Sequence, residues 1–88
     1  MAEATERVWL VEREYSDKGL LTLVYATRDG ERYLQSNRSS NMLRGNNVTA
    51  AKEADPDRLE SVEDPDLRER YAAEADRVAA NNDPGDAI

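Results

Sequence analysis

The sequence predicts an α+β fold in which a three- to four-stranded antiparallel β-meander packs against a C-terminal α-helix. Three observations support this prediction. The first third of the chain is rich in β-branched, aromatic and leucine residues. Two glycine-containing turns, at 17–19 and 29–30, divide this region at hairpin spacing. The last third carries an Asp-Pro helix start followed by apolar residues at helical spacing.

Three runs of residues are expected to form the strands, namely 7–15, 20–27 and 31–36. The second run is apolar almost throughout, which is typical of a central strand covered on both faces. The first run alternates, and strict alternation gives it two faces. One face carries Val8, Leu10, Glu12 and Glu14, and the other carries Trp9, Val11, Arg13 and Tyr15.

The segment 48–54 remains open between a short helix and a fourth strand. Its alanines, lysine and glutamate favour a helix, whereas its short length and the Asp55-Pro56 pair that follows favour a strand. Asp55-Pro56 and Asp64-Pro65 both read as helix starts, because Asp caps free N–H groups and Pro fits the first helical position. The second start predicts a helix over 65–80. Residues 1–80 are therefore expected to form a single domain, and 81–88 a flexible tail.

Composition limits the chemistry available to the chain. It has 88 residues with neither Cys nor His, which excludes disulfides, thiolate nucleophiles, imidazole acid–base pairs and Cys/His zinc sites. No apolar run reaches the ~20 residues that a membrane helix needs, so we expect a cytoplasmic protein. The net charge is −7, with ten arginines and two lysines among the 12 basic residues, which is typical of proteins adapted to high salt.

Two acidic groups fit other roles better than that of a catalytic or metal site. A calcium loop of the EF-hand type starting at Asp55 would need an oxygen ligand at Leu59, Gly at Glu60 and Glu at Asp66, so it fails at three positions. Glu12 and Glu14 share a predicted strand face, but cross-strand ion pairs with nearby arginines explain them better than catalysis does. We therefore expect no catalytic residue, no metal, no cofactor and no small-molecule substrate.

The aromatic residues indicate an interaction surface. The first two strands are apolar on both faces, yet the sequence offers only one substantial helix to cover them. An uncovered apolar sheet face is a typical association site, so we expect a homodimer or a complex with another protein. Whether the segment 37–54 covers the second face instead remains open. The expected surface comprises Trp9, Val11, Tyr15, Tyr25 and Tyr33.

An alternative hypothesis is a binder of phosphate or single-stranded nucleic acid. Residues 28–52 carry five basic and two acidic residues, with Tyr33 interleaved, and stacking plus charge is how such ligands are bound. The sequence pI of about 4.5 weighs against this hypothesis. We expect these arginines to pair with the acidic C-terminal third instead. The anion contacts would be Arg28, Arg32, Arg38 and Arg44.

Three segments also resemble a group of small acidic proteins of halophilic archaea. They are 8–13 (Val-Trp-Leu-Val-Glu-Arg), 25–33 (Tyr-Ala-Thr-Arg-Asp-Gly-Glu-Arg-Tyr) and 64–71 (Asp-Pro-Asp-Leu-Arg-Glu-Arg-Tyr). That family has no assigned activity, cofactor or catalytic residue, so the resemblance transfers no functional residue to this chain. It implies adaptation to high salt.

Overall fold

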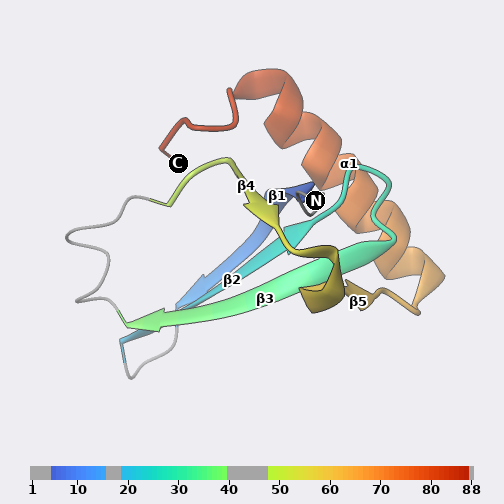
Figure 1. Ribbon diagram of the computed structural model, residues 1–88, viewed down its shortest axis with the longest axis horizontal. Helices are drawn as coiled ribbons and strands as arrows, with labels where there is room; N and C mark the ends of the chain where they lie inside the picture. The colour runs from blue at the N-terminus through green and yellow to red at the C-terminus, as the bar shows by residue number, and fades with distance from the viewer. Residues whose placement is uncertain (1–4, 16–18, 40–47, 88) are drawn as a thin grey trace, which may run out of the picture.

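A computed structural model of the chain describes residues 5–15, 19–39 and 48–87. It confirms the α+β fold: a five-stranded antiparallel sheet of order β4-β1-β2-β3-β5 packs against one C-terminal helix, α1 (Figure 1). The sheet has one strand more than the upper limit of the prediction. The meander consists of β1 (Glu6–Tyr15), β2 (Leu20–Ala26) and β3 (Arg32–Ser39).

The glycine of each predicted turn has a positive φ, 77° at Gly19 and 72° at Gly30, while residues 17 and 18 of the first turn lie outside the described residues. This left-handed conformation is readily adopted by glycine because it has no Cβ. β1 pairs with β2 from Trp9↔Ala26 to Tyr15↔Leu21, and β2 pairs with β3 from Leu20↔Ser39 to Ala26↔Tyr33. The ends of the three strands at Tyr15, Leu20 and Ser39 therefore lie together, and we call this the free end of the sheet.

The open segment 48–54 contains a strand, β4 (Ala51–Ala54), which pairs antiparallel with the first half of β1. Its residues have high helix propensity, but the sheet edge overrides this weak preference. Pairing satisfies the backbone of β4 and buries Ala51 and Ala54 on opposite faces, each in a different apolar cluster.

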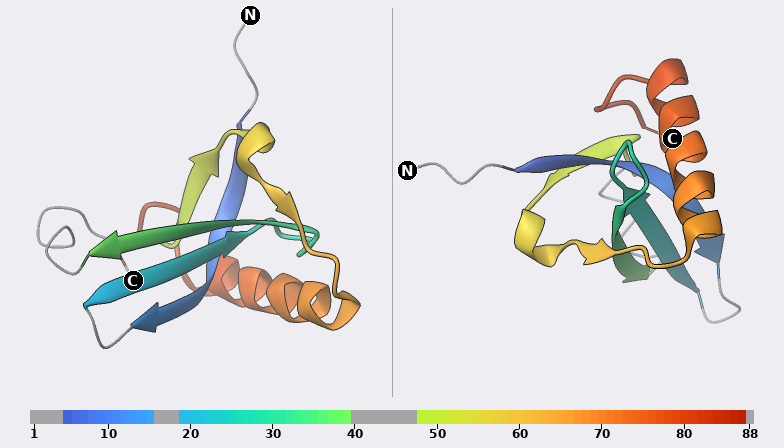
Figure 2. Two further views of the ribbon diagram at one scale, coloured as in Figure 1. Left: turned by 90° about the horizontal axis from the view of Figure 1, so that it is seen from below. Right: turned by 90° about the vertical axis from the view of Figure 1, so that its right-hand side faces the viewer.

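The chain then runs from β4, at one edge of the sheet, to β5 (Glu60–Ser61) at the other edge. It passes a single 3-10 turn, η2 (Pro56–Arg58), capped by Asp55 as the sequence predicts. This crossing lies on the face of the sheet opposite α1 (Figure 2). Leu59 from the crossing and Val48 from the preceding segment pack against that face. The second face is thus covered within the chain, partly by Val48 and Ala54 of the segment 37–54, whose residues 40–47 lie outside the described ranges.

α1 spans Pro65–Asn81, one residue beyond the predicted end. The Asp64 carboxylate accepts a hydrogen bond from the Asp66 N–H at 3.0 Å, which caps the helix as expected. Tyr71, Ala75 and Val78 form its buried stripe, with Leu67 and Ala79 partly buried beside it. This is the apolar stripe that the sequence predicts.

A β-bulge changes the face assignment of β1. The pairing register shifts between Leu10 and Glu12, so Val11 is an extra residue without a partner on β2. Strict alternation therefore holds through Val11 and is wrong from Glu12 onward. Glu12 and Glu14 pair with Val24 and Thr22 on the helix-covered face, whereas Arg13 and Tyr15 lie on the opposite face with Leu10.

Part of the expected tail lies against the sheet edge. The N–H of Ala50 donates to the carbonyl of Asp86 at 2.8 Å, and the N–H of Ala51 donates to that of Pro84 at 3.0 Å. Thr49 and Ala87 form an antiparallel bridge. These contacts place residues 84–87 beside β4, while the flexibility of 81–88 in solution stays a prediction.

Candidate functional site

The five residues of the expected interaction surface do not share one exposed face. Trp9 and Val11 are buried beneath α1, and Tyr25 is buried on the opposite face of the sheet. Tyr33 is partly buried against the helix-side cluster. Only Tyr15 is exposed, at 63%.

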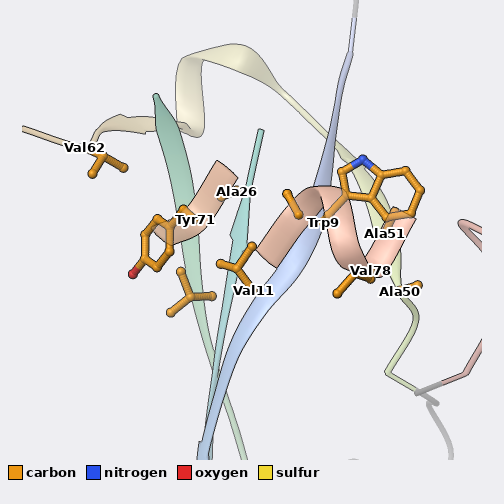
Figure 3. Close-up of a cluster of buried hydrophobic side chains, with 10 residues drawn as sticks. Trp9, Val11, Ala26, Ala50, Ala51, Val62, Tyr71 and Val78 are labelled. Carbon is orange, nitrogen blue, oxygen red and sulfur yellow. The ribbon is translucent and has the colours of Figure 1, made fainter. Parts of the chain in front are cut away.

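Trp9 is a core residue in the single chain, with 6% of its surface exposed. Its indole lies close to Ala51 and Val78, and Val11 separates it from the ring of Tyr71 (Figure 3). Burial of a side chain this large contributes several kcal/mol to folding. The apolar character of the two strand faces therefore reflects two internal clusters, one under α1 and one under the β4–β5 crossing.

Two arginines of the alternative site, Arg28 and Arg32, already have carboxylate partners. Arg28 pairs with Asp76 of α1 at 2.5 Å, and Arg32 pairs with Glu6 of β1. The backbone of Arg38 pairs with Leu21 on β2, and Arg44 lies outside the described residues. The pairing of Arg28 with Asp76 is the contact with the acidic C-terminal third that the sequence predicts.

Lys52 lies over the ring of Tyr25, with its Nζ 4.9 Å from the ring centroid. This is a cation–π distance. It ties β4 to the centre of the sheet, on the face opposite α1. Lys52 therefore contributes to packing on that face.

One acidic residue of β1, Glu12, is held by the helix. Glu12 accepts from Arg70 of α1 at 3.2 Å, so its ion pair joins the sheet to the helix and does not cross between strands as expected. Arg7 and Glu53 do form a cross-strand pair, at 2.9 Å between β1 and β4. Within the described ranges, no three acidic side chains converge on a point that could hold a metal ion.

The turn between β2 and β3 is fixed by a buried hydroxyl. Thr27 donates to the Asp29 carboxylate at 2.5 Å, and the N–H of Glu31 donates to the same oxygen at 3.0 Å. The hydrogen bond from Thr27, followed by that from Glu31, lowers the pKa of Asp29 below its usual value of 3.8. This turn packs directly on α1 through Gly30.

A groove of about 180 Å³ lies between β1 and α1. β1 contributes residues 10–13 and α1 contributes Glu74, Arg77 and Val78. Leu10 and Arg13 belong to one face of the sheet, whereas Val11 and Glu12 belong to the other. Because side chains from both faces line it, the groove lies at the edge of β1 and not on either face.

The same stretch of β1 has an open edge. β4 pairs with β1 only from Glu6↔Ala54 to Trp9↔Ala51, and the N–H of Leu10 donates to Ala50 at 2.9 Å. Beyond Leu10, no described strand pairs with that side of β1. Sequence reasoning missed this groove because it depends on the bulge and on the short length of β4, neither of which has a clear sequence signal.

In the described ranges, no helix has the length and hydropathy needed to cross a membrane.

Comparisons with known proteins identify a family but no activity. No curated protein and no solved structure matches the chain. A family model described as "Family of unknown function (DUF7967)" matches residues 2–88, and the chain belongs to this family.

Proposed function

We propose that this chain is a non-catalytic interaction protein that binds another protein through the free end of its sheet. The observation that carries the proposal is the distribution of apolar surface. The two large hydrophobic side chains exposed among the described residues are Tyr15, at 63%, and Leu20, at 47%. Both lie at this end of the β1–β2 hairpin, and Tyr15 continues the open edge of β1.

A heteromeric partner fits the packing better than a homodimer does. The homodimer prediction depends on an apolar sheet face without a cover, whereas α1 covers one face and the β4–β5 crossing covers the other. The ion pairs of Arg28 and Arg32 likewise favour this proposal over the anion binder, because those guanidinium groups already have carboxylate partners.

The working environment proposed is a cytoplasm of high salt. The net charge of −7 and the excess of arginine over lysine support this. At 1 M salt the Debye length is about 3 Å, so charge repulsion within the acidic chain is largely screened. Charge repulsion between this chain and an acidic partner is screened in the same way. Association would then depend on apolar and backbone contacts more than on long-range charge attraction.

The test is co-purification of partners in molar KCl with three forms of the full chain. The double variant Tyr15→Lys with Leu20→Lys removes the exposed apolar pair, and Glu69→Lys on the exposed side of α1 changes charge away from the free end. A protein retained by the wild type and by Glu69→Lys, and lost by the double variant, supports the proposal. Equal retention by all three overturns it.

Light scattering on a sizing column distinguishes the homodimer. A monomeric mass at low and at molar salt is the expected result for the isolated chain. A dimer that the double variant abolishes would assign the free end to self-association and would contradict a heteromeric partner.

A further inference from the structure

The groove between β1 and α1 lies at the open edge of β1, where some backbone N–H and C=O groups point away from β2. Successive residues of a strand point these groups to alternate sides. The N–H of Leu10 points toward Ala50, so the backbone groups of its neighbour Trp9 point toward β2. Trp9 pairs with Ala26 and Glu12 with Val24, two positions apart on β2. The backbone groups of Glu12 therefore also point toward β2, and Val11 is the extra residue of the bulge.

Alternation beyond the bulge then directs the N–H and C=O groups of Arg13 and Tyr15 away from β2. No described strand accepts or donates to them. Such an edge can hydrogen-bond an extended segment, which would add a strand to the sheet. The helix supplies a second wall, because Val78 of α1 lines the groove together with Val11.

The charged side chains around the groove indicate which charge a ligand should carry. Glu74 and Arg77 pair with each other at 2.8 Å, and Glu12 pairs with Arg70 at 3.2 Å. Arg13 is exposed and, in the part of the chain that the structure describes, has no carboxylate partner. A ligand that carries a carboxylate opposite Arg13 would complete the charge pairing of this edge.

A second copy of β1 fits this edge poorly. Two antiparallel strands related by a two-fold axis place one residue opposite its own copy. In the registers centred on Glu12, Arg13 or Glu14, a charged residue faces its own copy, and like charges directly opposite each other are destabilising. These three registers therefore disfavour symmetric pairing of two copies of β1, although the outward backbone groups of the edge have no partner strand among the described residues.

We propose that the groove between β1 and α1 binds an extended peptide segment of a partner protein, which adds to β1 as a further strand beside Arg13 and Tyr15. The segment carries a small aliphatic side chain that packs against Val11 and Val78, and a carboxylate that pairs with Arg13. This inference rests on the proposed function and names the form in which the partner binds.

The test uses a display library of random peptides selected against the full chain in molar KCl. Enriched peptides should carry an acidic residue beside a small aliphatic residue. Arg13→Pro removes an outward N–H, a change that an edge strand tolerates, and should weaken peptide binding at least tenfold. Arg13→Ala is the matched control, because it retains the N–H and should lower affinity only through the lost charge.

A measurement on the wild type guards against a variant that fails to fold. Bound peptide should slow hydrogen exchange at the amides of Arg13 and Tyr15 and leave Glu14, which already faces β2, unchanged. The inference is overturned if no peptide is enriched, or if peptides bind without protecting these two amides.

The two proposals fail separately. If a natural partner is lost with the Tyr15→Lys and Leu20→Lys double variant but binds Arg13→Pro normally, the free end is the interaction site and strand addition is wrong. If selected peptides protect Arg13 but no partner depends on Tyr15 and Leu20, the groove binds peptides and the proposed function is wrong.

Discussion

Gly30 of the β2–β3 turn packs on the backbone of Arg68 in α1. A Cβ at Gly30 would lie 2.1 Å from the carbonyl oxygen of Arg68 and 2.7 Å from the nitrogen of Ala72. Both contacts are with backbone atoms, which cannot move without displacing the helix. The turn also requires φ of 72°, so the absence of a side chain here serves both the turn and the packing of α1 on the sheet.

Gly30→Ala should therefore destabilise the fold by about 2–4 kcal/mol, the sum of a left-handed backbone penalty and overpacking. Urea denaturation followed by the fluorescence of Trp9 would measure it. Gly85→Ala is the control, because a Cβ there meets nothing within 4 Å and its φ is not positive. Equal stability of Gly30→Ala and wild type would contradict the close packing.

Deletion of Val11 should leave the fold intact. Since Val11 is the extra residue of the bulge, its removal joins Leu10 to Glu12 in a regular ladder and keeps every other side chain on its present face. The expected cost is about 2 kcal/mol for the lost buried side chain. Circular dichroism and urea denaturation would test this.

Deletion of Val24 provides the contrast for Val11. No register shift is found between β2 and β3, so loss of one residue from β2 would move half of the strand's side chains to the wrong face. We expect that variant to be unfolded. A folded Val24 deletion, or an unfolded Val11 deletion, would mean that the bulge does not set the face assignment.

Stability should fall in acid partly through Asp29. The folded pKa of Asp29 is lowered, chiefly by the Thr27 hydroxyl, so its contribution is fully present above the unfolded value of about 4 and is lost as the pH falls below it. Asp29→Asn should therefore reduce the loss of stability between neutral pH and about pH 3. Urea midpoints of both proteins at the two pH values would check this, and identical differences would contradict it.

Alkaline pH should act through Tyr71. Burial, and then the nearby charge of Glu12, raise the pKa of its phenol above the usual value of 10. A raised folded pKa stabilises the protein fully below about pH 10, and this contribution is lost as the pH rises further. Tyr71→Phe should show a smaller loss of stability above pH 10 in thermal melts than the wild type, and an equal loss would refute the assignment.

Local signals in the sequence predicted most of the fold. Gly19 and Gly30 mark the hairpin turns, and Asp64 with Pro65 marks the start of α1, because each acts through its own backbone or its immediate neighbours. β4 could not be decided, since its helix propensity is overridden by a pairing with β1 that lies far away in sequence.

The candidate site could not be predicted for a related reason. Trp9 and Tyr25 are not exposed, and they lie on opposite faces of the sheet: α1 covers Trp9, and the β4–β5 crossing covers the face of Tyr25. The crossing provides its cover through Leu59, a single apolar residue in an otherwise charged and polar segment, which has no clear signal in the sequence. The bulge at Val11 could not be predicted from the sequence either. Val is an ordinary strand residue, and the register shift depends on how β1 pairs with β2.

The placement of β4 also sets the order in which contacts can form as the chain folds. β1 and β2 are close in sequence, and hairpins form within microseconds, whereas the contact between Arg7 of β1 and Glu53 of β4 spans 46 positions. The meander can therefore assemble first, with β4 docking late. Ala54→Gly should then speed unfolding more than it slows refolding in stopped-flow experiments. Until β4 arrives, the whole outer edge of β1 faces the surrounding chains, and this interval is when aggregation of the nascent protein is most favoured.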